Sequence, residues 1–305
     1  MSDEAVKKLK TKVLRSSKGA EVSNGDSLLV NYAGTLMDGT PFDANYNFTT
    51  FAPAIPANTY FRSNGAALLQ PQSVPFDFVI GAGQVIKGWD KALNGRRIGE
   101  VLELKIPANL AYGEEGAGDR IPPNSPLRFT VELLATIPEG EQQPVFPDIQ
   151  DIGLNPKQIG LDDKTLEAMN QVKIGLSTKD RLNGDNSADL LIGMGGNDQL
   201  MGAGGADVLI GGKGKNRYIY IDVEDSPATK GEQDKILKFG KKDKINLQGL
   251  AEDLQYIGSS KFTATAGDVR FSKGTLQVDA DGDKSADFAI QLPGTDSLKG
   301  SNLVL

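Results

Sequence analysis

Three segments in the first half of the chain alternate apolar and polar residues with a period of two. Such alternation is typical of antiparallel strands with one buried face, and the segments are residues 27–32, 101–106 and 127–134. Residues 87–93 fit a short helix, because a glycine follows closely, as is common beyond a helix C-terminus. The pattern predicts a compact domain of strands and one helix over residues 5–137.

The segment that follows, residues 138–174, has no steady apolar period. It contains four prolines, and such a composition is typical of interdomain linkers. Asp162 or Asp163 can cap a brief helix that runs to about Val172. We therefore expect a linker with one short helix here and a second domain over residues 175–305.

The second domain begins with a periodic, glycine-rich segment. Ten glycines occur in the 31 residues from Gly184 to Gly214, and nine-residue cuts give GDNSADLLI, GMGGNDQLM, GAGGADVLI and GGKGKNRYI, preceded by a degenerate GLSTKDRLN. A disordered linker, the alternative, would not keep an acid at position six and an apolar residue at position eight in fixed phase. The sixth positions are Asp180, Asp189, Asp198, Asp207 and Asn216.

The spacing of these acids favours a hard cation. Glycines allow turns with positive φ that direct carbonyl oxygens inward, and the apolar residues form very short strands around a narrow core. Stacked turns place Asp carboxylates of successive layers together, and a divalent cation with oxygen ligands relieves their mutual repulsion. Lys213, Lys215 and Asn216 depart from the pattern, which weakens the case for a site in the last unit.

The nonapeptides resemble the RTX repeats (GGxGxD), whose parallel β-roll holds Ca²⁺ between alternate turns. The segments 234–250 and 256–292 resemble the C-terminal module of serralysin-type secreted proteins, so this resemblance spans about residues 175–305. It implies an all-β domain with a parallel β-roll, in which structural calcium binding is linked to folding. The implied ligands form two pairs, Asp180 with Asp198 and Asp189 with Asp207.

A further acidic loop, DADGDKSAD, occupies residues 279–287. Carboxylates at alternate positions around Gly282 can wrap one calcium ion, although the loop lacks the flanking helix and the final Glu of an EF-hand. The alternative is a solvated polar hairpin with negative charge. The candidate ligands are Asp279, Asp281, Asp283 and Asp287.

The 305 residues include no histidine and no cysteine. This excludes histidine-based acid–base chemistry, serine and cysteine triads, His-ligated zinc, disulfides and iron–sulfur clusters. The zinc protease that accompanies serralysin-type modules is excluded too, because its HExxH ligands cannot be supplied. A net charge of −7 argues against a nucleic-acid partner. The uncharged segment 44–61 contains two prolines, so we expect no membrane span.

Three blocks in the first domain carry a second resemblance: VNYAGTLMDGTPFD (30–43), GQVIKGWDKALNG (83–95) and LAYGEEGAGDRIPPNSPLRFTVELL (110–134). In this order they resemble the FKBP-type peptidyl-prolyl isomerases, whose α+β fold is a curved antiparallel sheet around a short helix. The resemblance spans nearly all of residues 5–137 and agrees with the alternation. The pocket that it implies consists of Tyr32, Phe42, Asp43, Phe76, Val85, Ile86, Trp89, Tyr112, Ile121 and Phe129.

The resemblance also implies roles for these residues. Trp89 is the floor of the pocket, other aromatic residues are its walls, and the Tyr112 hydroxyl and the Ile121 N–H bind carbonyls of the ligand. Asp43 tunes the field and orders the hydroxyl of Tyr32. Without the context of the three blocks, the same aromatic residues would be interpreted as core, and Asp43 as a turn or cap residue.

The chemistry implied is rotation about X–Pro bonds without nucleophile, proton transfer or cofactor. The barrier of roughly 18–20 kcal/mol comes from amide resonance, and an apolar pocket desolvates the planar, more polar ground state more than the twisted transition state. The expected partners are proline-containing polypeptides and macrolide-type immunophilin ligands. The alternative function is a noncatalytic, calcium-dependent extracellular or surface protein that holds proline-containing partners.

The expected location follows from the resemblance to serralysin-type modules. Serralysin-like tails are associated with type I secretion, and the first residues lack the apolar stretch of a Sec signal. We therefore expect a secreted protein that uses type I secretion machinery, with a cytoplasmic location as the alternative. The long connection over residues 44–74 either extends the substrate groove or is a plain surface insertion.

Overall fold

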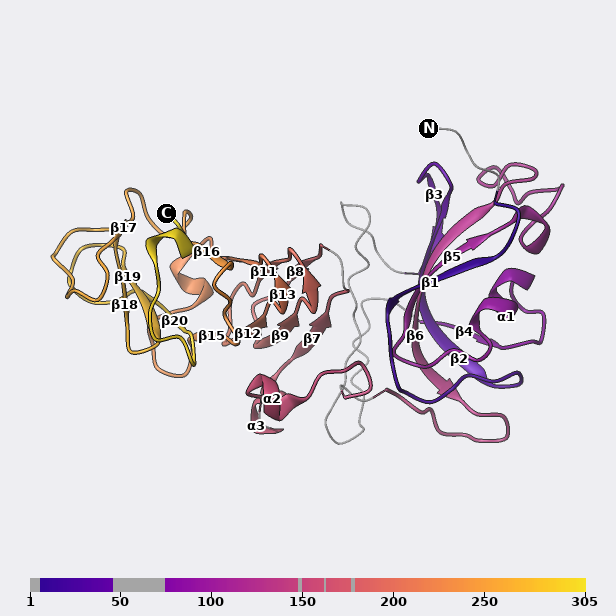
Figure 1. The fold of residues 1–305 in the computed structure, drawn as a ribbon, viewed down its shortest axis with the longest axis horizontal. Coiled ribbons are helices and arrows are strands. Elements are labelled where there is room, and N and C mark those ends of the chain that lie inside the picture. Colours follow the sequence, from indigo (N-terminus) through magenta and orange to yellow (C-terminus); the bar gives the residue numbers. More distant parts are fainter. Residues whose placement is uncertain (1–5, 46–74, 148–149, 162, 177–178) are drawn as a thin grey trace. The chain divides into compact units, whose positions relative to one another are not determined.

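The computed structural model divides the chain into two compact units, which meet in sequence between Asn155 and Pro156. The segment that we expected to be a linker is divided between them at this boundary. Each unit is considered by itself below. The residues that the structure describes are 6–45, 75–147, 150–161, 163–176 and 179–305 (Figure 1).

The first unit is built on a six-stranded, antiparallel sheet. Its strands are β1 (Lys10–Arg15), β2 (Ser27–Leu36), β3 (Pro41–Ala44), β4 (Phe76–Val79), β5 (Val101–Ile106) and β6 (Leu127–Ile137). The order is β1-β5-β6-β2-β3, and β4 pairs with the first half of β2 while β3 pairs with the second half. The three segments with period-two alternation lie in β2, β5 and β6, so the expected strands are confirmed.

One short helix, α1 (Lys87–Leu93), packs on this sheet, at the residues where it was expected. Its buried side is small and apolar where it meets the sheet, since a Cβ atom on Gly88 would overlap the side chain of Ile106 in β5. Trp89 and Leu93 enter the core that the sheet encloses. A 3₁₀ turn, Ala108–Leu110, follows β5.

The second unit is rich in short strands. Helices α2 (Pro156–Ile159) and α3 (Asp163–Ala168) precede them. The helix expected to reach Val172 ends at Ala168, because Val172 lies in a strand that pairs with the first nonapeptides. The strands are β7 (Gln171–Ile174), β8 (Arg181–Asn183), β9 (Asp189–Ile192), β10 (Gly195–Gly196), β11 (Gln199–Met201), β12 (Val208–Ile210), β13 (Lys213–Gly214), β14 (Arg217–Ile219), β15 (Asp234–Ile236), β16 (Lys244–Asn246), β17 (Gln255–Tyr256), β18 (Asp268–Ser272), β19 (Thr275–Asp279), β20 (Phe288–Gln291) and β21 (Leu303–Val304).

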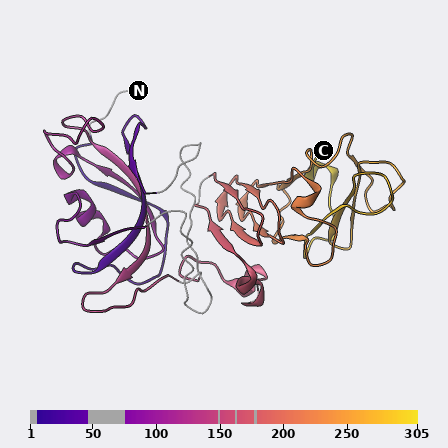
Figure 2. The same cartoon turned by 180° about the vertical axis from the view of Figure 1, so that it is seen from behind.

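The nonapeptides stack as parallel strands in two large sheets, and β10 pairs with β13 in a small third one (Figure 2). One sheet has the order β21-β16-β14-β11-β8, and the other runs β17-β18-β19-β20-β15-β12-β9-β7. Gln199 pairs with Arg181, and Val208 pairs with Leu190. Neighbouring strands of one sheet are therefore two nonapeptides apart in the sequence. Strands β18, β19 and β20 pair antiparallel at the far end.

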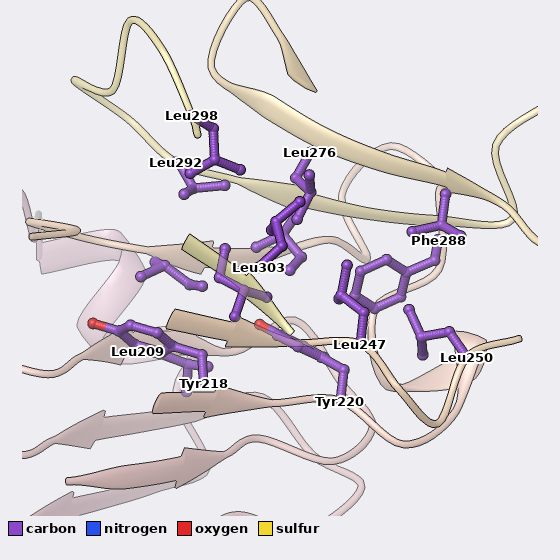
Figure 3. Close-up of a cluster of buried hydrophobic side chains, with 14 of the residues drawn as sticks. Leu209, Tyr218, Tyr220, Leu247, Leu250, Leu276, Phe288, Leu292, Leu298 and Leu303 are labelled. Atoms are coloured by element: carbon purple, nitrogen blue, oxygen red, sulfur yellow. The ribbon is translucent and has the colours of Figure 1, made fainter. Parts of the chain in front are cut away.

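The core of the second unit is a ladder of side chains from these layers. Leu182, Leu191, Leu200 and Leu209, which occupy the eighth positions of their units, are all buried in it. Figure 3 shows Tyr220 next to Phe288 of β20, whose ring it meets edge to face at 5.0 Å, while Tyr218 lies in the same core. In the described part of the chain, every helix is too short or too polar to cross a membrane.

Candidate active site and metal centre

An aromatic cluster lies between α1 and the sheet of the first unit. The ring centroid of Trp89 lies 5.2 Å from those of Tyr32 and Phe129, and both pairs meet edge to face. Phe129 contacts Phe42 in the same way at 5.4 Å, and Phe76 contacts Tyr32 at 5.8 Å. Strands β2, β3, β4 and β6 and helix α1 therefore bring together five of the six aromatic residues that the sequence singled out, while the sixth, Tyr112, lies in the turn after Ala108–Leu110.

The cluster grades from a buried floor to an exposed rim. Trp89 and Phe129 are only 3% and 4% exposed, whereas Phe76 and Tyr112 are 37% and 41% exposed. Tyr32 is half-buried between these two groups. An apolar ring of a ligand could therefore approach over the rim and rest on apolar side chains that water does not reach.

Asp43 holds the Tyr32 hydroxyl near the rim, and its charge acts on the Tyr112 hydroxyl. The Tyr32 hydroxyl donates a hydrogen bond of 2.7 Å to Asp43 Oδ2. Burial, and then this hydrogen bond, raise the pKa of Tyr32, and burial followed by the charge of Asp43 raises the pKa of Tyr112. Both hydroxyls stay protonated, and that of Tyr112 has no hydrogen-bond acceptor in the described part of the chain.

A pocket of about 370 Å³ opens beside the cluster. Four of the ten predicted residues line it, namely Phe42, Asp43, Tyr112 and Ile121. The remaining wall is the loop 117–120, which Arg120 ties to strand β3 through a 3.1 Å hydrogen bond from Nη1 to the Phe42 carbonyl.

The expected role of the Ile121 N–H is not supported by the structure. This N–H donates a hydrogen bond of 3.1 Å to the carbonyl of Ala117, because residues 117 and 121 form an antiparallel bridge that closes their loop. Val85 and Ile86 are half-buried against the core. The N–H of Ile86, at the uncapped start of α1, has no acceptor among the described residues, so it is the backbone donor left open here. The sequence placed Ile86 in the pocket without indicating this donor, although a helix start always leaves N–H groups free.

In the second unit, the acids at the sixth positions are buried in two columns. The N–H of Asp180 donates to Asp198 Oδ1 at 2.9 Å, and the N–H of Asp189 donates to Asp207 Oδ1 at 2.8 Å. All four residues are between 0% and 3% exposed. The structure thus brings together the two pairs that the sequence paired.

The columns continue beyond the residues that we singled out. The N–H of Asp207 donates to Asp234 Oδ1, and the N–H of Asn216 donates to Asp243 Oδ1, both at 2.9 Å. The missed signal is the nine-residue phase itself, which continues after Asn216 through Asp225, Asp234 and Asp243 although the glycines become sparser.

Two layers contain carboxylate oxygens without a partner. Oδ2 of Asp198 and Oδ2 of Asp207 are buried and accept no hydrogen bond within the described part of the chain. Burial raises the pKa of Asp198 to about 7, and burial together with the charge of Asp189 raises the pKa of Asp207. A buried acceptor without a donor is costly unless something else pairs with it.

The surroundings of these oxygens fit a calcium ion. A Cβ atom on Gly193 would overlap both Asp198 Oδ2 and the carbonyl oxygen of Gly211, so the two oxygens face one small space. A Cβ atom on Gly202 would overlap Asp207 Oδ2. Carboxylate and carbonyl oxygens that converge without a side chain between them are the ligands that calcium prefers.

The loop over residues 279–287 brings three of its four predicted ligands together. Carboxylate oxygens of Asp279, Asp281 and Asp283 lie within 4.8 Å of one another, while Asp287 accepts the N–H of Ala280 at 2.7 Å. Asp279 itself accepts two backbone N–H groups of the loop. The loop therefore closes on its own hydrogen bonds, and the polar hairpin stays an alternative to a cation site.

Comparisons with known proteins match each unit separately. Residues 18–134 match the family model for FKBP-type peptidyl-prolyl cis-trans isomerase, and residues 165–305 match that for the C terminus of Peptidase M10 serralysin. FK506-binding protein 2 of Dictyostelium discoideum is 40% identical over 37% of this chain and 68% of its own length. Peptidyl-prolyl cis-trans isomerase FKBP2 of Homo sapiens is 42% identical over 36% of this chain and 61% of its own length. Among solved structures, FkpA from Escherichia coli is 34% identical, with a TM-score of 0.31 over 42% of this chain and 47% of that chain.

Proposed function

The chain belongs, through residues 18–134, to the family of FKBP-type peptidyl-prolyl cis-trans isomerases, and we propose that its first unit isomerises X–Pro bonds of polypeptides. The observation that carries this proposal is the aromatic cluster, which is graded from the buried Trp89 to the exposed Phe76 and Tyr112. The same pocket would accept macrolide-type immunophilin ligands, since these occupy the site of the proline.

The proposed mechanism uses desolvation and two hydrogen-bond donors. The aromatic floor removes water from the amide, which disfavours the planar ground state more than the twisted transition state because the latter has a smaller C=O dipole. The Tyr112 hydroxyl, which burial and Asp43 keep protonated, and the open N–H of Ile86 are available to hold carbonyls of the peptide. Asp43 holds the Tyr32 hydroxyl through its 2.7 Å hydrogen bond, so that Tyr32 stays at the wall.

This activity is tested directly with the full chain. We expect it to accelerate cis–trans exchange of a proline-containing tetrapeptide well beyond the uncatalysed exchange, which takes tens to hundreds of seconds. The measurement is exchange spectroscopy by NMR at several protein concentrations, with a macrolide immunophilin ligand as the inhibitor. A chain that binds the peptide without accelerating exchange would support the noncatalytic alternative instead.

For the second unit we propose a parallel β-roll that binds structural calcium. The unpaired Oδ2 atoms of Asp198 and Asp207 support this, as does the match to the serralysin C-terminal model. When bound, Ca²⁺ supplies the charge neutralisation that these buried carboxylates lack. Asp180 and Asp189 hold their partners in register through backbone N–H groups. Secretion by a type I machinery stays a prediction from the resemblance.

The raised pKa of Asp198 predicts how stability depends on pH without calcium. Its pKa is about 7 in the folded chain against an ordinary value of 3.8, so between these values the folded state holds a proton that the unfolded state has lost. Stability of the second unit therefore falls as the pH rises from about 4 to about 7. Urea unfolding in a chelator, followed by circular dichroism, should give a lower midpoint at pH 8 than at pH 5.

Two controls define this pH experiment. Trp89, the sole tryptophan, reports the first unit by fluorescence and separates its unfolding from that of the second. Asp198→Asn removes one of the buried carboxyls with a raised pKa and should weaken the dependence, while Asp207, whose pKa burial also raises, keeps part of it. Equal midpoints at the two pH values in the unsubstituted chain would contradict the burial of an unpaired carboxylate.

A further inference from the structure

Three consecutive turns of the second unit share a backbone conformation that its first turns lack. Met194, Ala203 and Gly212 have φ values of 66°, 65° and 79°, and each lies four residues before the sixth-position side chain of its nonapeptide. In the first turns the equivalent residues instead donate their N–H groups to the carboxylate, as Leu176 does to Asp180 Oδ2 at 2.6 Å and Asp185 does to Asp189 Oδ2 at 2.8 Å. In the three turns with positive φ, no such hydrogen bond to the sixth-position side chain forms among the described residues, and we call these turns open.

In the third open turn, an amide nitrogen stands where the other two have a carboxylate oxygen. A Cβ atom on Gly211 would overlap Asn216 Nδ2, just as Cβ atoms on the corresponding glycines of the two preceding turns would overlap Asp198 Oδ2 and Asp207 Oδ2. Asn216 Nδ2 donates a hydrogen bond of 3.2 Å to the carbonyl of Gly212. Its Oδ1 accepts the N–H of Asp198 at 3.1 Å, as an aspartate would.

We infer that the side-chain amide of Asn216 takes the place of a cation in the third of these turns, so that this turn needs no calcium. Asn216 therefore marks the boundary between a calcium-dependent part of the roll before it and a calcium-independent part after it. The amide N–H turns toward a carbonyl oxygen and thereby satisfies both groups. Lys213 and Lys215, exposed in the same nonapeptide, add positive charge that disfavours a divalent cation. This inference rests on the calcium binding proposed above for the turns of Asp198 and Asp207.

The second column closes in a similar way one layer later. Asp234 is fully buried, and its Oδ2 accepts a hydrogen bond of 3.0 Å from the hydroxyl of Tyr220. Its Oδ1 accepts the N–H of Asp207, and its own N–H donates to Ser226 Oγ at 2.9 Å. Asn216 and Asp234 therefore pair with hydrogen-bonding groups of the chain, and in the described part of the two columns no carboxylate beyond Asp207 is left without a partner.

Hydrogen exchange of the full chain, measured by mass spectrometry with calcium and with a chelator, tests this inference. We expect peptides from residues 180–207 to lose protection in the chelator, and peptides from 217–246 to keep theirs. Loss of protection in both segments together would overturn the inference while leaving the calcium binding in place. If neither segment responds to calcium, the proposed calcium function fails, and the inference fails with it.

A substitution tests the role of Asn216 itself. Asn216→Asp places a third unpaired carboxylate in an open turn, so we expect the chain to bind one more calcium ion than the unsubstituted protein, counted by equilibrium dialysis. In the chelator, peptides next to position 216 should lose protection. Asn246→Asp is the matched control, because Asn246 lies outside the columns and its Oδ1 accepts the N–H of Gln248. Equal stoichiometry and protection in the two variants would overturn the inference.

Discussion

Phe129→Ala is expected to lower kcat/KM for X–Pro isomerisation by about ten- to a hundredfold. Each aromatic contact that is lost is worth roughly 0.5–1.5 kcal/mol, and about 1.4 kcal/mol of lost transition-state stabilisation lowers the rate tenfold. The Phe129 ring meets those of Phe42, Trp89 and Tyr32. Its removal opens the floor of the pocket to water, which solvates the planar amide and raises the barrier to rotation. The measurement is NMR exchange on a proline tetrapeptide with the full chain.

Stability has to be separated from catalysis in this variant, because truncating a buried Phe costs about 3–5 kcal/mol. The fluorescence of Trp89 reports whether the first unit is folded under the conditions of the assay. Phe288→Ala is the matched control, since Phe288 is fully buried and meets Tyr220 edge to face in the second unit. It should destabilise that unit and leave the rate of isomerisation unchanged. A folded Phe129→Ala chain with full activity would contradict the desolvation mechanism.

The first unit could be predicted largely from its alternation, because a sheet with one buried face imposes a strict period of two. The segments 27–32, 101–106 and 127–134 lie inside β2, β5 and β6. The Ile121 N–H could not be judged in this way. Whether it is free depends on the bridge to Ala117, which forms only when the loop closes in three dimensions.

In the second unit the sequence showed the phase of the acids but not their hydrogen bonding. Asp198 and Asp180 hold the same position in their nonapeptides, yet only Asp180 Oδ2 receives the N–H of the residue four positions earlier. The difference lies in Met194 and Ala203, which adopt positive φ without being glycine. A pattern of glycines cannot indicate such residues, because the conformation is imposed by the stacking of neighbouring turns.

Gly202→Ala should remove one calcium ion per chain and shift the calcium midpoint of folding to several-fold higher concentration. A Cβ atom at this position would overlap Asp207 Oδ2 and occupy the space next to it, and overpacking of this kind costs about 1–3 kcal/mol. Equilibrium dialysis gives the number of ions, and circular dichroism during a calcium titration gives the midpoint.

Gly204→Ala provides the matched control two residues away in the same turn. Its Cβ atom would meet only ordinary contacts, the nearest at 3.5 Å from Asn186 Cα. An alanine in a compatible conformation also reduces the entropy of the unfolded chain, which stabilises a protein by about 0.4–1 kcal/mol. We therefore expect the same stoichiometry as in the unsubstituted chain, with an unchanged or slightly lower calcium midpoint. If both variants lose the same number of calcium ions, the turn simply does not tolerate side chains. The effect at Gly202 then gives no evidence that Asp207 faces a cation.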